Sequence, residues 1–185
     1  MNNQIKRIIE FIFEVGTLRR MNRQHLQKLA KTEDSVADHS FRVAVIGYLL
    51  AKEEGVDADK VLKMCLFHDI AEARTGDHDW FHKKYVKINE WKVIKSQWQE
   101  FNFGKDVIKL FKEYLARKTK EAKVAKEADD LEQIFQLKEY ADQGNKEAER
   151  WLPYNSKRIK SKIGQEIIKE LQKSNIHDWW WKKWR

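Results

Sequence analysis

Apolar residues recur along this chain at intervals of three and four, which is the spacing of one face of an α-helix. The first such stretch predicts an amphipathic helix over Asn3–Val15 that is buried in the core. A second stripe predicts a helix that Asp34 or Ser35 caps and that ends at about Glu54, before Gly55. Alternation with a period of two has little support, so these stripes favour an all-α fold.

Helical spacing continues towards the C-terminus. A third helix follows the cap residue Asp57 and continues through His68 to a break at Thr75. Pro153 marks the break before the last predicted helix. The remaining helices are predicted over Val86–Phe101, Asp106–Lys118, Thr119–Gln143 and Ser156–Lys173. These patterns predict an all-α, single-domain helical bundle over residues 1–175 and a tryptophan-rich tail over 176–185.

The length and net charge of the chain limit the kinds of ligand that it is expected to bind. A chain of 185 residues suits one domain with a substantial core and is short for two. The formal net charge of +8 attracts anions of any kind, from nucleic acid to small phosphorylated substrates. Lysines alternate with glutamates, as in Lys118–Lys126, which favours solvated helix faces over a nucleic-acid stripe. We therefore expect a nucleotide-like small molecule rather than nucleic acid.

The sequence also favours a cytoplasmic protein. Its single cysteine, Cys65, lies in an apolar run and cannot form an intrachain disulfide, which fits a buried thiol in a reducing compartment. No stretch approaches about 18 consecutive apolar residues, so no membrane span is expected. The N-terminal segment is amphipathic and lacks the pattern of a secretory leader.

The candidate chemistry lies at the end of the third predicted helix, in the stretch 66–77. If this helix is continuous, His68 and Glu72 lie one turn apart on one face, with Asp69 on its flank. A neighbouring imidazole and carboxylate suit a divalent transition metal with open coordination positions. The further ligands must come from elsewhere, and His39 is one candidate.

The other candidate is an aspartate in the pair Asp129 and Asp130. Ala125, Ala128 and Leu131 mark the buried face of the helix that carries this pair. Asp129 lies on the edge of that face and can point inward, whereas Asp130 faces somewhat away. The chain thus carries a His…His-Asp…Asp pattern.

The motifs S-V-A-D-H-S, H-D-x-x-E-x-x-x-G-D and A-D-x-L, in that order, resemble those of the HD-domain metal-dependent phosphohydrolases of the 5'-deoxynucleotidase-like group, over about residues 15–145. The resemblance implies hydrolysis of nucleoside 5'-monophosphates, deoxyribonucleotides above all, to nucleoside and phosphate. It implies a divalent metal (Mn, Co, Fe, Ni or Zn, which the sequence does not distinguish) and a set of site residues. These are the metal ligands His39, His68, Asp69 and Asp129, with Glu72 orienting or deprotonating the nucleophilic water and Asp77 as a second catalytic acid.

Substrate contacts are predicted on two segments. Similar proteins carry a nucleotide-contacting arginine at the place of Arg23, and Arg19 and Arg20 compete for that role. Lys83 and Lys84, in the loop after Asp77, are candidates for binding phosphate. The chain departs from its relatives after the arginine, where they often carry a tryptophan near the sugar, so sugar selectivity is open. Two loop histidines, His78 and His82, offer a weaker second metal site.

Several alternatives remain open at this stage. Another phosphohydrolase of the same superfamily, acting on an alarmone or a phosphodiester, would use the same metal. A non-catalytic nucleotide or nucleic-acid binding module would instead depend on basic residues and the tail. The four tail tryptophans suit packing on the domain or on a second subunit of a homodimer, with a peripheral membrane anchor or a base-stacking surface as further options.

Overall fold

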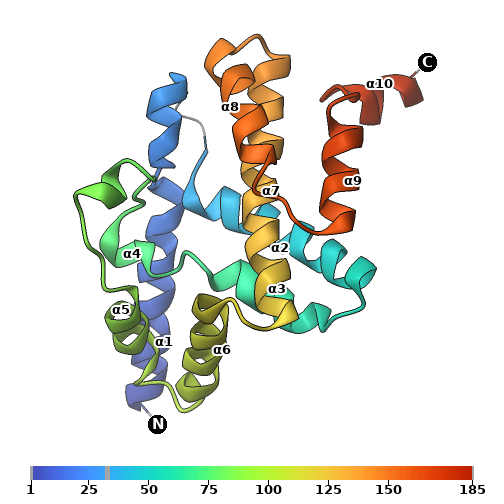
Figure 1. The fold of residues 1–185 in the computed structure, drawn as a ribbon. Coiled ribbons are helices and arrows are strands. Elements are labelled where there is room, and N and C mark those ends of the chain that lie inside the picture. Colours follow the sequence, from blue (N-terminus) through green and yellow to red (C-terminus); the bar gives the residue numbers. More distant parts are fainter. Residues whose placement is uncertain (1, 32–33, 185) are drawn as a thin grey trace.

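Helices account for the secondary structure of residues 2–31 and 34–184, which this computed structural model describes (Figure 1), and they confirm the predicted all-α class. The α-helices are α1 (Asn2–Val15), α2 (Val36–Glu54), α3 (Ala58–Phe67), α4 (Glu72–Thr75), α5 (Glu90–Trp98), α6 (Gly104–Ala116), α7 (Lys120–Asp142), α8 (Lys146–Ser156), α9 (Lys162–Leu171) and α10 (Asp178–Trp184). Three short 3-10 helices complete them: η1 (Gly16–Arg20), η2 (Gln24–Leu29) and η3 (His82–Lys84). None of the helices described is long and apolar enough to cross a membrane.

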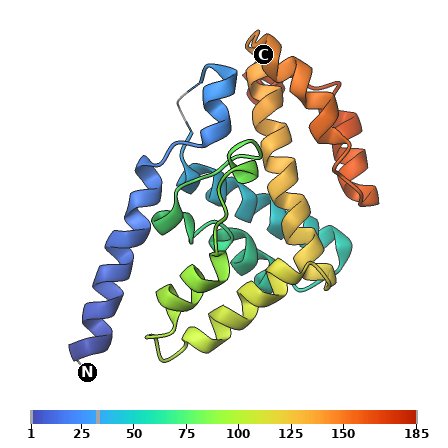
Figure 2. The same cartoon turned by 60° about the vertical axis from the view of Figure 1, so that its left-hand side comes forward.

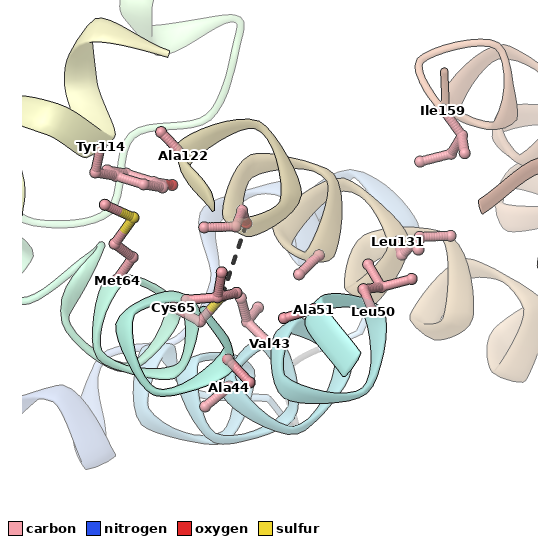
Figure 3. Packing of buried hydrophobic residues seen from close by; sticks show 14 of the residues in the cluster. Val43, Ala44, Leu50, Ala51, Met64, Cys65, Tyr114, Ala122, Leu131 and Ile159 are labelled. Carbon is pink, nitrogen blue, oxygen red and sulfur yellow. Dashed lines mark hydrogen bonds between the residues drawn. The ribbon is translucent and has the colours of Figure 1, made fainter. Parts of the chain in front are cut away.

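The main core lies where α2, α3 and α7 pack together (Figure 3). Val43 and Leu50 of α2 meet Cys65 of α3 and Leu131 of α7, all of them buried. Gly47 permits the close approach of α2 to α3, because a Cβ at this position would overlap the sulfur of Cys65. This contact fixes the ends of α2 and α3 that carry the candidate ligands.

A second apolar cluster joins α1, α5 and α6, where Phe11, Trp98 and Phe101 pack edge to face or tilted. Figure 2 shows α1 along one side of the molecule and α8 and α9 along the other. The prediction that α1 is buried is only half right. Its stripe of Ile5, Ile9 and Ile12 is 50–63% exposed, because only the face that carries Phe11 meets the cluster.

The predicted caps are largely confirmed. Ser35, rather than Asp34, caps α2 through a reciprocal pair of hydrogen bonds with Asp38, both 3.1 Å long. Gly55 ends this helix in the left-handed conformation at φ 66°. Asp57 caps α3 as expected, and Thr119, predicted as the start of a helix, is the N-cap of α7.

Two of the predicted helices after Asp77 have wrong boundaries. Pro153 does not precede the last helix but lies inside α8, a helix that the sequence patterns missed. Asn145 holds this helix in place: its side-chain oxygen accepts from the N–H of Ala148, and its amide donates to the carbonyl of Leu29. The last predicted helix therefore begins later, as α9. The helix predicted over Val86–Phe101 is also shorter than expected, because the side chain of Asn89 caps α5.

Candidate metal centre

Four predicted ligands converge on one point. His39 comes from the first turn of α2, His68 and Asp69 follow α3, and Asp129 comes from the middle of α7. The Nε2 atoms of the two histidines are 3.2 Å apart. Asp129 Oδ1 lies 3.3 Å from Nε2 of His39 and 3.8 Å from that of His68, and Asp69 Oδ2 lies 3.5 Å and 3.0 Å from the same atoms.

This donor set fits a divalent transition metal. Two imidazole nitrogens and two carboxylate oxygens combine borderline and hard donors, and they leave coordination positions for water or substrate. For three of these residues, His39, His68 and Asp129, the donor atoms all lie within 4.8 Å of one another. Asp130 points elsewhere, since it accepts from Lys126 at 2.9 Å and pairs with Arg158. The choice of Asp129 over Asp130 therefore agrees with the geometry.

The expectation of one continuous helix through His68 and Glu72 is wrong. α3 ends at Phe67, and the next N–H groups donate to carbonyls three residues back: Ile70 to Phe67 at 3.0 Å and Glu72 to Asp69 at 2.9 Å. In an α-helix, consecutive side chains diverge by about 100°. The structure nevertheless brings the neighbouring side chains of His68 and Asp69 to one point, with Asp69 Oδ2 3.0 Å from Nε2 of His68.

A buried carboxylate that the sequence analysis missed orients His39. Glu132, one turn after Asp129 on α7, is 1% exposed and contacts Nδ1 of His39 through a short hydrogen bond. Its other oxygen accepts from Nε and Nη2 of Arg42 at 3.0 and 2.7 Å. Nδ1 of His68 lies 2.7 Å from the carbonyl of Cys65. Each Nδ1 thus faces an acceptor, which directs Nε2 to the centre.

The charges around the centre shift the titration of its members. Burial alone would lower the pKa of His39, but Glu132 and Asp129 outweigh it and raise the pKa to about 9. Burial opposes ionisation of Asp129, yet Lys126 and the histidines hold the pKa of its carboxyl well below the usual range. Lys126 donates to Asp129 at 2.7 Å. Lys126 and the raised pKa of His39 thus place positive charge beside these carboxylates.

A pocket of about 200 Å³ opens beside the four donors, and Glu72, Asp77 and Lys83 line it with Arg23. Arg23 lies 3.2 Å from Asp69 and 3.9 Å from Asp77. Burial would lower the pKa of this guanidinium, but the two carboxylates outweigh burial and raise it. Asp77 is held in place because it accepts from the backbone N–H of Gln24 at 2.6 Å.

Glu72 is the least compensated acid of the pocket. Burial, with repulsion from Asp69 and Asp77, raises the pKa of its carboxyl to about 10. Its Oε2 is buried without a hydrogen-bond partner among the described residues. An acid with a raised pKa in a pocket with cationic groups is the environment in which proton-transfer residues are found.

Comparison with known proteins shows the family to which this chain belongs. A family model described as an HD domain matches residues 15–172. The chain belongs to the HD-domain family. It is 31% identical over 147 residues to 5'-deoxynucleotidase HDDC2 of Bos taurus, covering 76% of this chain and 71% of that protein. The Dictyostelium discoideum protein of the same name is 32% identical over 149 residues, with 73% of this chain and 78% of the relative covered.

Solved structures agree with this HD-domain fold. A conserved hypothetical protein from Pyrococcus furiosus superposes with a TM-score of 0.73 at 31% identity, covering 90% of this chain and 99% of that one. A protein from Pyrococcus horikoshii OT3 gives 0.72 at 30% identity, with 88% and 97% covered.

Some of the other predicted site residues of this HD domain line the pocket, and some do not. Lys83 lines it, whereas Lys84 lies over the ring of Trp80 at 5.5 Å, and Arg19 is exposed on η1. His78 also lines the pocket. His82 is not part of this lining, and its Nδ1 lies 2.9 Å from Oδ1 of Asp79, which is.

Sequence reasoning missed several lining residues. His25, whose Nε2 lies 2.7 Å from Gln136 Oε1, and Arg158 both line the pocket, and neither lies in a motif. Trp80, also in the lining, is 57% exposed. Trp80 lies within the loop after Asp77, where the sequence predicts substrate contacts, although the sequence does not single out this residue.

Proposed function

We propose that this HD-domain protein is a metal-dependent phosphohydrolase that converts nucleoside 5'-monophosphates, preferentially deoxyribonucleotides, to nucleoside and inorganic phosphate. The observation that carries the proposal is the convergence of four metal-type donors, from His39, His68, Asp69 and Asp129, beside a pocket that holds both a carboxyl without a hydrogen-bond partner on one oxygen and fixed cations. The names of the curated relatives, 5'-deoxynucleotidases, support the choice of substrate.

His39, His68, Asp69 and Asp129 would hold the metal. Mn, Co, Fe, Ni and Zn all suit such a mixed set of donors. A bound divalent ion of this kind polarises a phosphoryl oxygen and lowers the pKa of water. The contacts of Glu132 and of the Cys65 carbonyl with the two Nδ1 atoms would keep both Nε2 atoms available as donors.

Arg23 and Lys83 would bind the phosphate dianion. The guanidinium of Arg23 is held by Asp69 and Asp77, so the substrate meets a charge already in place. Glu72 would accept the proton of the attacking water, and Asp77 would fix Arg23 and face the leaving oxygen. Glu72 holds its proton at neutral pH while the site lacks added positive charge, because burial and Asp69 raise its pKa.

Trp80 on the pocket wall would stack against the nucleoside. Its ring is more than half exposed beside Lys83, and a base offers the flat partner that such a ring favours. This position differs from that of the tryptophan that relatives often carry after the arginine and that this chain lacks. The sugar preference would then rest on contacts from the 78–84 loop.

The proposal is tested by phosphate release from deoxy- and ribonucleoside 5'-monophosphates, 3'-monophosphates, guanosine tetraphosphate and single-stranded oligonucleotides, with Mn²⁺ or Co²⁺. The 5'-monophosphates should react fastest. The variants Asp129→Asn and Asp130→Asn form a matched pair: the first should lose metal and activity, and the second should retain bound metal. Faster cleavage of the oligonucleotide or the tetraphosphate would refute the substrate assignment.

We further propose that the protein forms a homodimer through the exposed stripe Ile5, Ile9 and Ile12 of α1. Apolar stripes of this kind on a protein surface mark contact sites. Light scattering should then give twice the mass of the chain, and Ile9→Glu should give the monomer. The free, buried Cys65 suits action in a reducing compartment such as the cytoplasm.

A further inference from the structure

A second cavity, of about 510 Å³, lies on the other side of α7 from the metal centre, between α7, the end of α2 and the start of α9. It is more than twice the size of the pocket at the metal centre. Its apolar wall includes Leu50, Val56 and Ile163. Six cationic side chains line it against three carboxylates, and the cations are Arg117, Lys120, Lys123, Lys126, Arg158 and Lys160.

Two of the three carboxylates are already compensated within the wall. Glu127 accepts the backbone N–H groups of Lys160 and Ser161, both at 3.0 Å, and the hydroxyl of Ser161. Asp130 is shared between Lys126 and Arg158. Both carboxylates are therefore hydrogen-bonded within the wall, and the cationic side chains that line the cavity still outnumber the acidic ones.

Four of the six cations form no ion pair with these carboxylates among the described residues, and Lys120 and Lys123 are two of them. They lie one turn apart on the first turns of α7, on the same side of the helix. Both are exposed, and neither has an ion pair with any residue that the structure describes. Two lysines held together without a counter-charge repel each other, and an anion between them removes that repulsion.

Arg117 adds a constrained guanidinium. Its backbone is left-handed at φ 53°, a conformation that costs energy for a residue with a side chain. Its guanidinium lies 3.4 Å from the ring centroid of Tyr114. Nη1 is buried without a hydrogen-bond acceptor in the described part of the chain. Nη1 is itself buried against the protein, so Arg117 lines the cavity through its other atoms and adds a fixed positive charge to the wall.

We propose that this cavity is a second ligand site, which binds a phosphorylated small molecule the size of a nucleotide. Lys120, Lys123 and Arg117 would take the phosphate groups, and the apolar wall would take the flat or aliphatic body. A volume of this order, with an apolar lining and a few convergent polar groups, is typical of small-molecule sites.

The wall between the two cavities connects the new site to the metal centre. Lys126 and Arg158 line both cavities. Lys126 Nζ lies 2.7 Å from the proposed ligand Asp129 and 2.9 Å from Asp130. An anion that draws Lys126 towards the larger cavity removes a contact of Asp129. Occupancy of one site therefore affects the other, and such coupling is reciprocal.

The test uses the full-length, metal-free protein and a fluorescent N-methylanthraniloyl nucleoside diphosphate, whose binding is followed by anisotropy. The cavity variant is Lys120→Glu with Lys123→Glu. The matched control is Lys109→Glu with Lys112→Glu, which makes the same charge change at the same spacing on the exposed face of α6. A third variant, Arg23→Ala, removes the arginine of the metal-centre pocket.

We expect the cavity variant to weaken binding of the probe at least 10-fold, while the control and Arg23→Ala stay within about 2-fold of the wild type. Circular dichroism and thermal melting check that each variant is folded, and Lys120→Ala with Lys123→Ala replaces the cavity variant if it is not. Binding that is lost in Arg23→Ala and unchanged in the cavity variant would overturn the proposal, as would equal losses in the cavity and control variants. So would the absence of wild-type binding up to millimolar probe. None of these outcomes depends on the hydrolysis proposed above.

Discussion

Replacing Glu132 by glutamine tests whether the acid behind His39 is required for metal binding. The carboxylate is buried and serves two partners: one oxygen faces Nδ1 of His39, and the other accepts twice from Arg42. An amide of the same shape cannot do both. If its oxygen faces His39, its NH₂ group opposes the donors of Arg42. If its NH₂ group faces His39, the imidazole must carry its proton on Nε2, which is the atom needed for the metal.

Either orientation weakens the site. Loss of an outer hydrogen-bond partner of a metal-bound histidine typically costs 10–100-fold in metal affinity, which is about 1.4–2.7 kcal/mol. Stability should fall less steeply than for a deletion, because Arg42 keeps its contact with Glu139 at 2.6 Å. A loss of about 1–3 kcal/mol in the free energy of unfolding is expected for the disturbed buried pair.

The assay is Mn²⁺ or Zn²⁺ titration by calorimetry, with urea unfolding of the metal-free protein beside it. Glu139→Gln is the matched control, since it removes the other carboxylate of Arg42 and leaves His39 untouched. The control should bind metal like the wild type. Wild-type affinity in Glu132→Gln, or an equal loss in both variants, would show that the contact with His39 does not orient the ligand.

Three further outcomes are expected. Glu72→Gln should keep bound metal, measured by elemental analysis, and lose at least about 100-fold in turnover, because an amide cannot accept the proton of water; near-normal turnover would place proton transfer elsewhere. Burial and repulsion by Glu132 raise the pKa of Asp34 from 3.8 to about 6. The folded state thus favours the protonated acid, so the free energy of unfolding falls as pH rises from about 4 to 6. Asp34→Asn should remove this fall. It should stabilise the metal-free protein by about 1 kcal/mol at pH 7, a small effect because part of the group is exposed. Gly47→Ala should lower the free energy of unfolding by about 1–3 kcal/mol through overlap with Cys65, and adding Cys65→Ala should restore much of it in urea titrations; no recovery would mean that another contact resists the added methyl group.

The ligand pattern was predictable because the chemistry restricts the residue types. Few side chains bind a transition metal, so His39, the His68-Asp69 pair and Asp129 stand out in the sequence. This holds even though the helix around His68 was predicted incorrectly. The break after Phe67 was not predictable, since apolar spacing reports which face is buried and not whether a hydrogen bond spans three or four residues.

Glu132 illustrates the other limit of the sequence. It lies in α7 among many charged residues, and most acids on such a helix face water. Only the position of His39 on another helix shows that this acid is buried and what it contacts. The helix boundary predicted at Pro153 was wrong for a related reason. A proline usually ends a helix, but here the cap at Asn145 and the buried Ala148 determine where α8 begins.

The register of α7 has a consequence for the evolution of this protein. Asp129, Glu132 and Gln136 contact three different parts of the site from a single helix: the metal donors, His39, and His25 with Asp34. One residue inserted between 129 and 136 would rotate everything after it by about 100° and separate the two halves of this set. Changes in chain length among homologues should therefore collect in loops such as the turn at Gly144, where φ is 90°, and should leave the spacing from 129 to 136 intact.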